Sequence, residues 1–304
     1  MCECGAGLAA RPPRRMPTAV ALGVLDERRG SGLHEVIPST MGEPLLWSGL
    51  DALLDRCQAH GLAANVTTNG TWPGRGARRW AERLVPVASD VKVSWNGATA
   101  ATAAAVMPGL DLAAAVDGVR AFAAVRDAHA RDGGRRCRLS FQVTAQEANV
   151  GELADIVRLA AALGVDRVKL NHLQVRRPEL AERSLRRGPE AIGRWNAALR
   201  AARAAADATG VELENAVELS DDPAAPAPLG PCRFAGREAW IHADGRFAPC
   251  PHPAAAAGAL GAFGAIPART LGEIWESPAF RAFVERHEHH PVCRTCALRR
   301  PGGA

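Results

Sequence analysis

The sequence predicts an α/β fold: a partial (β/α)6 barrel of the TIM type, followed by a small cysteine-rich α+β module. Three observations support this prediction. From about residue 33, apolar segments of strand length alternate with longer segments of helical period; several strand segments end in polar, loop-forming residues; and a Pro/Ala-rich stretch precedes two pairs of cysteines. Strand, helix and strand in this alternation imply parallel strands joined by right-handed crossovers.

The six predicted strands are rich in β-branched residues and are bounded by turn signals. They are residues 33–40, 62–68, 90–95, 138–144, 166–173 and 211–218. Ser48 is predicted to cap a helix that stops near Gly61. Asp111 is predicted to open the helix over 112–130, and Asn149 a helix that ends at Gly164.

Polar residues follow several of these strands. In barrels of this kind the chemistry lies at the carboxyl ends of the strands, where the loops gather. Asn69 and Ser94 are therefore candidate site residues, and Gln142, Asn171 and His172 are candidates by position alone. The sequence assigns a catalytic role to none of them.

The chain is expected to divide into two parts. Residues 1–220 are predicted to form the barrel, without its first strand. The segment DDPAAPAPLGP, residues 221–231, breaks all periodicity and is predicted to be a linker. Residues 232–304 are predicted to form the cysteine-rich module.

The bulk composition excludes several classes of function. The chain has 304 residues and 47% apolar residues, but no run of 18 apolar residues and no secretory leader, so we expect a cytoplasmic protein without a membrane span. Its net charge of +5 comes from scattered arginines, since Lys92 and Lys169 are the only lysines. A solvated basic surface explains this charge better than a nucleic-acid partner.

The eight cysteines fall into different groups. Without a secretory signal, paired cysteines indicate a metal site or catalysis before disulfides. Cys57 lies on the apolar stripe of a helix and Cys137 flanks an apolar run, so both are predicted to be core residues. The metal ligands predicted near the chain end are Cys232, Cys250, Cys293 and Cys296, spaced C-x17-C and C-x2-C.

Local signals indicate how these four cysteines come together. Asp244-Gly245 joins two short strands and would return Cys250 toward Cys232. Ser277-Pro278 begins a last helix that delivers the C-x2-C pair. Four thiolates fit either a zinc ion or an iron–sulfur cluster, and the spacing does not separate the two. Four nearby histidines could substitute for a cysteine, but a His-rich exposed helix end is the commoner explanation for them: His252, His287, His289 and His290.

Several motifs resemble those of the radical S-adenosylmethionine superfamily. MGEPLL (41–46) resembles its GGEPLL element, VTTNGT (66–71) its third-strand segment, and VKVSWNGAT (91–99) its fourth-strand segment. Cys232, Gly245 and Cys250 form C-x12-G-x4-C, which is similar to the opening signature of the SPASM/twitch auxiliary-cluster domains. The likeness spans nearly the whole chain from about residue 33.

The resemblance implies a concrete chemistry. A [4Fe–4S] cluster binds S-adenosylmethionine and cleaves it to a 5′-deoxyadenosyl radical, which abstracts hydrogen from a peptide or a small polar substrate. Glu43 would accept hydrogen bonds from the methionine ammonium, and Ser94 would reach the ribose or the carboxylate. Gly42, Pro44 and Asn69 complete the implied cofactor-binding set. A reductant such as a flavodoxin or ferredoxin would supply electrons.

The same resemblance implies one auxiliary [4Fe–4S] cluster on the four C-terminal cysteines, as in the shorter twitch form. The sequence departs from the family where the radical cluster needs C-x3-C-x2-C, because the chain begins MCECGAG. We expect that Cys2, or alternatively Cys4, is the third ligand of a motif that lies upstream. A truncated, non-catalytic iron–sulfur protein of this fold and a zinc-stabilised binding protein remain the alternatives.

Overall fold

The computed structural model describes residues 15–38, 42–175, 177–220 and 230–299. They form two compact units, each built from more than one stretch of the chain. The barrel unit comprises residues 35–38, 42–46 and 63–220 of the described chain, and the cysteine unit comprises residues 15–34, 47–62 and 230–299.

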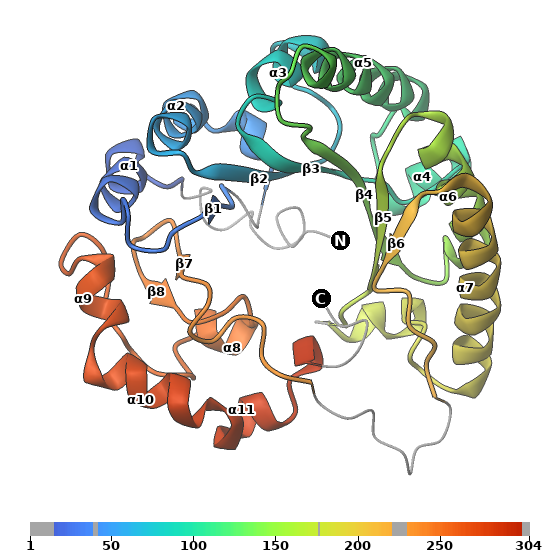
Figure 1. Cartoon of the computed structure of the whole chain (residues 1–304). Coiled ribbons are helices and arrows are strands. Elements are labelled where there is room, and N and C mark those ends of the chain that lie inside the picture. Colours follow the sequence, from blue (N-terminus) through green and yellow to red (C-terminus); the bar gives the residue numbers. More distant parts are fainter. Residues whose placement is uncertain (1–14, 39–41, 176, 221–229, 300–304) are drawn as a thin grey trace. The chain divides into compact units, whose positions relative to one another are not determined.

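The barrel unit contains a sheet of six parallel strands in sequential order (Figure 1). The predicted α/β fold, with parallel strands joined by crossover connections, is therefore confirmed. Each strand lies within one of the six predicted segments or overlaps it, although the two edge strands are shorter than predicted. The strands are β1 (Glu35–Val36), β2 (Ala63–Thr68), β3 (Ala88–Ser94), β4 (Arg138–Ala145), β5 (Arg167–His172) and β6 (Glu212–Glu214).

Helices of the barrel unit lie on the outer side of the curved sheet (Figure 1). Asp111 caps α5 by accepting a hydrogen bond from the Ala114 N–H, as predicted. Asn149 precedes a single 3₁₀ turn instead, and α6 begins only at Leu153. The elements are η3 (Pro44–Leu46), α3 (Gly76–Leu84), α4 (Ala100–Val106), α5 (Leu112–Arg131), η4 (Val150–Glu152), α6 (Leu153–Ala162), η5 (Pro178–Arg183) and α7 (Pro189–Thr209).

The two faces of the sheet differ in polarity because side chains alternate along each strand. One face is apolar and buried, and it includes Val66, Val91, Val93, Leu139, Phe141, Val143, Val168 and Leu170. The other face, here called the polar face, includes Glu35, Asn65, Asp90, Lys92, Ser140, Arg167, Lys169 and Glu214.

An ion-pair network occupies the polar face. Arg167 bridges Asp90 and Glu214, and Ser140 donates to Asp90 at 2.8 Å. Lys169 pairs with Glu214 at 2.9 Å. Both lysines of the chain therefore lie on this face. Because each buried charge has an opposite charge or a hydrogen-bond partner nearby, the sheet tolerates charges that would be costly alone.

A second buried network links α5 to the loop before β5. The Arg126 side chain is 1% exposed and contacts Asp127, Asp166 and the Gly164 carbonyl, each at 2.8 Å. Asp166 also accepts the Leu139 N–H at 2.8 Å. One carboxylate thus ties a helix, a loop and a strand together.

The cysteine unit is a set of short helices around a hairpin. Ser277 caps α10 by accepting the Phe280 N–H, with Pro278 at the first helical position, as predicted. The prediction for Ser48 was wrong, because α2 starts at Leu50 after Gly49 without a side-chain cap. Its elements are α1 (Thr18–Glu27), α2 (Leu50–His60), β7 (Trp240–Ile241), β8 (Phe247–Ala248), α8 (Pro253–Ala256), α9 (Leu271–Trp275), α10 (Pro278–Arg286), η6 (His287–His289), α11 (Pro291–Arg294) and η7 (Ala297–Arg299).

Aromatic packing and one carboxylate hold this unit together. Phe247, Phe263 and Phe280 pack edge to face, with ring centroids 5.1 to 6.0 Å apart. Glu27, the last residue of α1, accepts the N–H groups of Leu271 and Gly272 at 2.9 and 2.7 Å. A negative charge is stabilising at the start of α9, so α1 is fixed to the C-terminal part of the chain.

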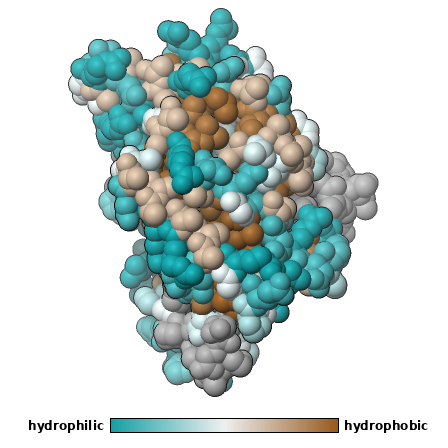
Figure 2. Space-filling model, turned by 90° about the vertical axis from the view of Figure 1, so that its right-hand side faces the viewer, coloured by the Kyte–Doolittle hydropathy of each residue, from teal (hydrophilic) through white to brown (hydrophobic). Residues whose placement is uncertain are grey.

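The face shown in Figure 2 carries hydrophilic residues with apolar residues interspersed among them. Among the described residues, the large apolar side chains that are exposed are Ile37, Leu46 and Val175. Within that same part of the chain, no helix is both long and apolar enough to cross a membrane.

Candidate functional site

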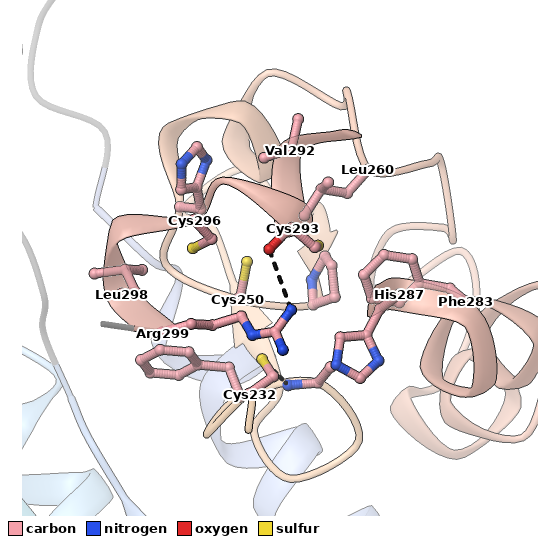
Figure 3. A pocket seen from close by; sticks show the side chains of 14 residues that line it. Cys232, Cys250, Leu260, Phe283, His287, Val292, Cys293, Cys296, Leu298 and Arg299 are labelled. Carbon is pink, nitrogen blue, oxygen red and sulfur yellow. Dashed lines mark hydrogen bonds between the residues drawn. The ribbon is translucent and has the colours of Figure 1, made fainter. Parts of the chain in front are cut away.

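All four C-terminal cysteines line one cavity of the cysteine unit (Figure 3). Cys232 precedes the turn at residues 235–237, Cys250 follows β8, Cys293 lies in α11, and Cys296 follows that helix. None of them forms a disulfide. Thiols that are far apart in sequence have therefore been brought together by tertiary packing, as predicted from their spacing.

The hairpin that carries Cys250 depends on Gly245. β7 and β8 pair antiparallel, and the turn between them is closed by a hydrogen bond from the Gly245 N–H to the His242 carbonyl at 2.8 Å. Gly245 has φ +84°, which is strained for any other residue. Its carbonyl also accepts the Ile266 N–H at 2.9 Å, so the turn is anchored to the neighbouring chain.

Arg299 fastens the two ends of the cysteine segment. Its Nε donates to the Gly230 carbonyl at 2.8 Å, and its Nη1 donates to the Cys293 carbonyl at 3.2 Å. The Gly230 N–H returns a hydrogen bond to the Arg299 carbonyl at 2.8 Å. The chain just before Cys232 is thereby held against α11.

The electrostatics of the site oppose free thiolates. Burial raises the pKa of Cys250 to about 11, and negative charge on the other three cysteines would raise it as well. Burial and the neighbouring thiolates also raise the pKa of Cys293, whereas Arg299 lowers it. The cluster of thiols thus favours a positively charged group that would neutralise the thiolates.

The donor set fits an iron–sulfur cluster, because four cysteine side chains line the cavity. Within the described part of the chain, no three His, Cys, Asp or Glu side chains form a group that could hold a metal ion, so the fit rests on the four thiols that share one cavity. Backbone N–H groups also reach the sulfurs, and that of Ala235 donates to Cys232 Sγ at 3.3 Å.

Two of the four histidines considered from the sequence line the cavity, His252 and His287. His287 Nδ1 contacts the Val284 carbonyl at 2.7 Å. The structure also adds a residue that the sequence pattern did not single out, Arg299. Its signal is weak because it is one arginine among many; only its position three residues after Cys296 could have suggested it.

A second candidate site lies at the carboxyl edge of β2 in the barrel unit. The Glu43 carboxylate accepts the Thr68 hydroxyl at 2.9 Å, the Asn69 N–H at 2.7 Å and the Leu45 N–H at 3.2 Å. Burial raises its pKa, and the hydrogen bonds from Asn69, Leu45 and Thr68 act in the opposite direction. Gly42 has φ +86°, and Pro44 begins η3.

Three other candidates, Ser94, Gln142 and Asn171, lie on the polar face of the sheet, on the side of Lys92 and Lys169. The Asn69 side chain accepts hydrogen bonds from Thr71, so only its backbone N–H reaches Glu43. Ser94 ends β3 and is partly exposed, in register with Gln142 of β4. Asn171 accepts from the Asn215 side chain at 2.9 Å.

His172 lies on the apolar side of β5. Its ring lies against Trp195 of α7, with centroids 4.3 Å apart. Burial, and secondarily the charge of Arg186, lowers its pKa to about 3. His172 is therefore a neutral core residue near pH 7.

The remaining cysteines separate as follows. Cys57 and Cys137 are buried, and burial raises their pKa values to about 11 and about 12, as suits core residues. Cys2 and Cys4 lie outside the described residues.

Comparison with family models identifies the C-terminal segment. Residues 232–297 match the SPASM model, described as an iron–sulfur cluster-binding domain. This segment is a SPASM domain. The match begins at Cys232 and includes all four cysteines of the cavity. No curated protein matches the chain.

Solved structures share the fold. SuiB of Streptococcus suis bound to S-adenosylmethionine matches with a TM-score of 0.67 and 15% identity, over 98% of this chain and 68% of SuiB. SuiB bound to the precursor peptide SuiA matches with a TM-score of 0.62 and 14% identity, over 91% of this chain and 62% of SuiB. The protein anSMEcpe with bound AdoMet matches with a TM-score of 0.62 and 14% identity, over 95% of this chain and 80% of anSMEcpe.

At this identity the likeness shows the fold alone. The chain spans 61% to 68% of the length of SuiB. The resemblance drawn from the sequence, to radical S-adenosylmethionine enzymes with a C-terminal SPASM-type domain, is confirmed in the SPASM segment and in the fold.

Proposed function

We propose that this chain binds an auxiliary [4Fe–4S] cluster in the SPASM domain and S-adenosylmethionine at the carboxyl edge of the barrel-unit sheet, as part of a radical enzyme that acts on a peptide. The observation that carries the proposal is the convergence of Cys232, Cys250, Cys293 and Cys296 on one cavity within a segment that matches an iron–sulfur cluster-binding domain. The likeness to SuiB and anSMEcpe supports the cofactor and the peptide class.

The four cysteines would hold the auxiliary cluster, which supplies one-electron chemistry when bound. The residues around them prepare the site. The Ala235 N–H stabilises charge on Cys232, Arg299 does so near Cys293, and apolar neighbours such as Leu260 and Phe283 limit the access of water. With all four ligands from the protein, the site suits electron transfer better than substrate binding.

We expect the chain, reconstituted without oxygen, to bind about four iron and four sulfide ions per molecule. Cys250→Ser should lose most of this iron, because the Cys250 thiol interacts with the thiols of all three other cysteines and a hydroxyl is a poor ligand for iron. Cys57→Ala, which removes a buried cysteine of α2 outside the cavity, is the matched control and should keep the iron. Stoichiometric zinc without sulfide would contradict the proposal.

Glu43 has capacity left for a ligand. A carboxylate offers about four lone-pair sites, and three of Glu43's are taken by Thr68, Asn69 and Leu45. These bonds fix the carboxylate at a strand end while leaving the residue partly exposed. The remaining lone pair can accept an N–H from the ammonium of S-adenosylmethionine, and the negative charge strengthens that bond. Ser94, the last residue of the next strand, would donate to a hydroxyl or carboxylate of the same ligand.

Glu43→Gln should weaken the binding of S-adenosylmethionine by roughly 10- to 100-fold, which corresponds to the loss of one hydrogen bond to a charged group. Equilibrium dialysis with the labelled cofactor measures the effect. Glu82→Gln, on the exposed surface of α3, is the control. Unchanged affinity in Glu43→Gln, with auxiliary iron intact, would remove Glu43 from the site.

The cluster that cleaves S-adenosylmethionine is a separate matter. It needs three cysteines spaced C-x3-C-x2-C, and MCECGAG provides Cys2 and Cys4 with one residue between them. Cys2, or alternatively Cys4, would be the third ligand of that motif, and no step of radical formation is assigned to either residue. A peptide substrate and a flavodoxin or ferredoxin as the electron donor remain part of the proposal.

A further inference from the structure

Arg299 is placed to act on charge in the SPASM cavity. Among the described residues that line it, Arg299 is the only lysine or arginine. Its side chain is 10% exposed, and it is fixed by the carbonyls of Gly230 and Cys293. A guanidinium held in this way cannot swing out to solvent without breaking both hydrogen bonds, so its charge stays at the cavity wall (Figure 3).

A fixed cation beside an iron–sulfur cluster favours the reduced state. Reduction takes one electron from a one-electron donor, a flavodoxin or ferredoxin in the proposal, and adds one negative charge to a group already surrounded by four thiolates. No proton, bond or leaving group is involved. Attraction to a nearby positive charge is stronger for the more negative state, and partial burial limits the screening by water.

We propose that Arg299 sets the redox poise of the auxiliary cluster by stabilising its reduced form. This inference rests on the proposed cluster at Cys232, Cys250, Cys293 and Cys296. Arg299 would act on the cluster through its positive charge, without binding it directly. Its hydrogen bonds to the Gly230 and Cys293 carbonyls hold that charge in place.

Glu288 partly offsets this charge and offers a test of opposite sign. It accepts a hydrogen bond from Arg299 Nη2 at 3.1 Å and is 58% exposed. Removing the Glu288 charge would leave the Arg299 charge less compensated. If the role of Arg299 were purely structural, there would be no reason for substitutions of Arg299 and of Glu288 to change the ratio of reduced to oxidised cluster in opposite directions.

The experiment is a redox titration of the reconstituted chain with dithionite, followed by electron paramagnetic resonance. At the potential where the wild-type cluster is half reduced, Arg299→Gln should lower the ratio of reduced to oxidised cluster at least tenfold, about 59 mV for a one-electron couple. Glu288→Gln should raise the ratio by about threefold, a smaller change because the carboxylate is solvent-screened. Arg299→Lys, which keeps the charge, should stay closer to the wild type than Arg299→Gln.

Arg269→Gln is the matched control, because Arg269 also donates to two backbone carbonyls in the cysteine unit but does not line the cavity. It should leave the ratio unchanged. The inference is overturned if the variants hold as much iron as the wild type and the ratio of reduced to oxidised cluster is unchanged. It is also overturned if Arg299→Gln and Glu288→Gln change that ratio in the same direction. If Arg299→Gln fails to hold iron, Glu288→Gln decides alone: a raised ratio supports the inference, and an unchanged or lowered one overturns it. A wild-type chain that takes up no iron and sulfide contradicts the proposed function itself, and the inference with it.

Discussion

Gly245→Ala is expected to destabilise the cysteine unit by about 2 to 5 kcal/mol. A left-handed backbone costs a residue with a Cβ about 1 to 2 kcal/mol, and forced overlap in a packed site adds about 1 to 3 kcal/mol. Both terms apply because Gly245 has φ +84° and an added Cβ would overlap the Ile266 carbonyl oxygen. That oxygen belongs to the backbone and cannot turn aside.

The consequence reaches the metal site, because the same turn returns Cys250 toward Cys232. Urea unfolding followed by circular dichroism measures the stability, and iron content after reconstitution reports the site. Gly258→Ala is the matched control: its φ is +82°, but an added Cβ would meet no atom within 4 Å. It should cost only the backbone term, about 1 to 2 kcal/mol. Equal losses in the two variants would show that the contact with Ile266 is unimportant.

Asp166→Ala is expected to destabilise the barrel unit by about 3 kcal/mol, near the lower end of the range for breaking a buried ion pair. The substitution leaves Arg126, which is 1% exposed, with only Asp127 as a charged partner, and it leaves the Leu139 N–H without its carboxylate acceptor. Asp166→Asn should cost less, since the amide oxygen can still accept from Leu139. Chemical denaturation measures both.

Asp155→Ala supplies the control for this prediction. Asp155 pairs with Arg158 at 2.6 Å on the surface of α6, and both side chains are 60% exposed. Solvent screening makes such pairs contribute at most about 1 kcal/mol, so the variant should be close to the wild type. If Asp155→Ala and Asp166→Ala lowered the free energy of unfolding by the same small amount, the buried network around Arg126 would contribute no more to stability than a surface ion pair.

Local sequence signals predicted much of the fold because they act over a few residues. Apolar runs of strand length, rich in β-branched residues, located the six strands. Asp111 and Ser277 each marked the start of a helix, and Gly245 marked a turn. Ser48 and Asn149 misled because a capping residue type is permissive and does not specify a start. Gly49 precedes α2, and a 3₁₀ turn precedes α6.

Some features of the candidate sites could likewise be predicted from the sequence, and others could not. The spacing of the four cysteines and the Asp-Gly turn were sufficient to predict a shared site, since each ligand type and each turn is a local property. The sequence could not show that Glu43 is held by Thr68 and Asn69, because those contacts cross 25 and 26 residues. Nor could it show that His172 packs under Trp195 while Asn171 lies on the opposite face.

By itself, then, the sequence determined the alternation of strands and helices, the four cysteines that share one cavity and the turn that returns Cys250 toward Cys232. Only the tertiary structure decided which charges share the polar face, that α1 joins the SPASM domain through Glu27, and that Arg299 stands at the cavity wall. The physical reason is range. Backbone preference and side-chain periodicity are set by near neighbours, whereas a buried charge takes its partner from whatever part of the chain packing brings within a few ångströms.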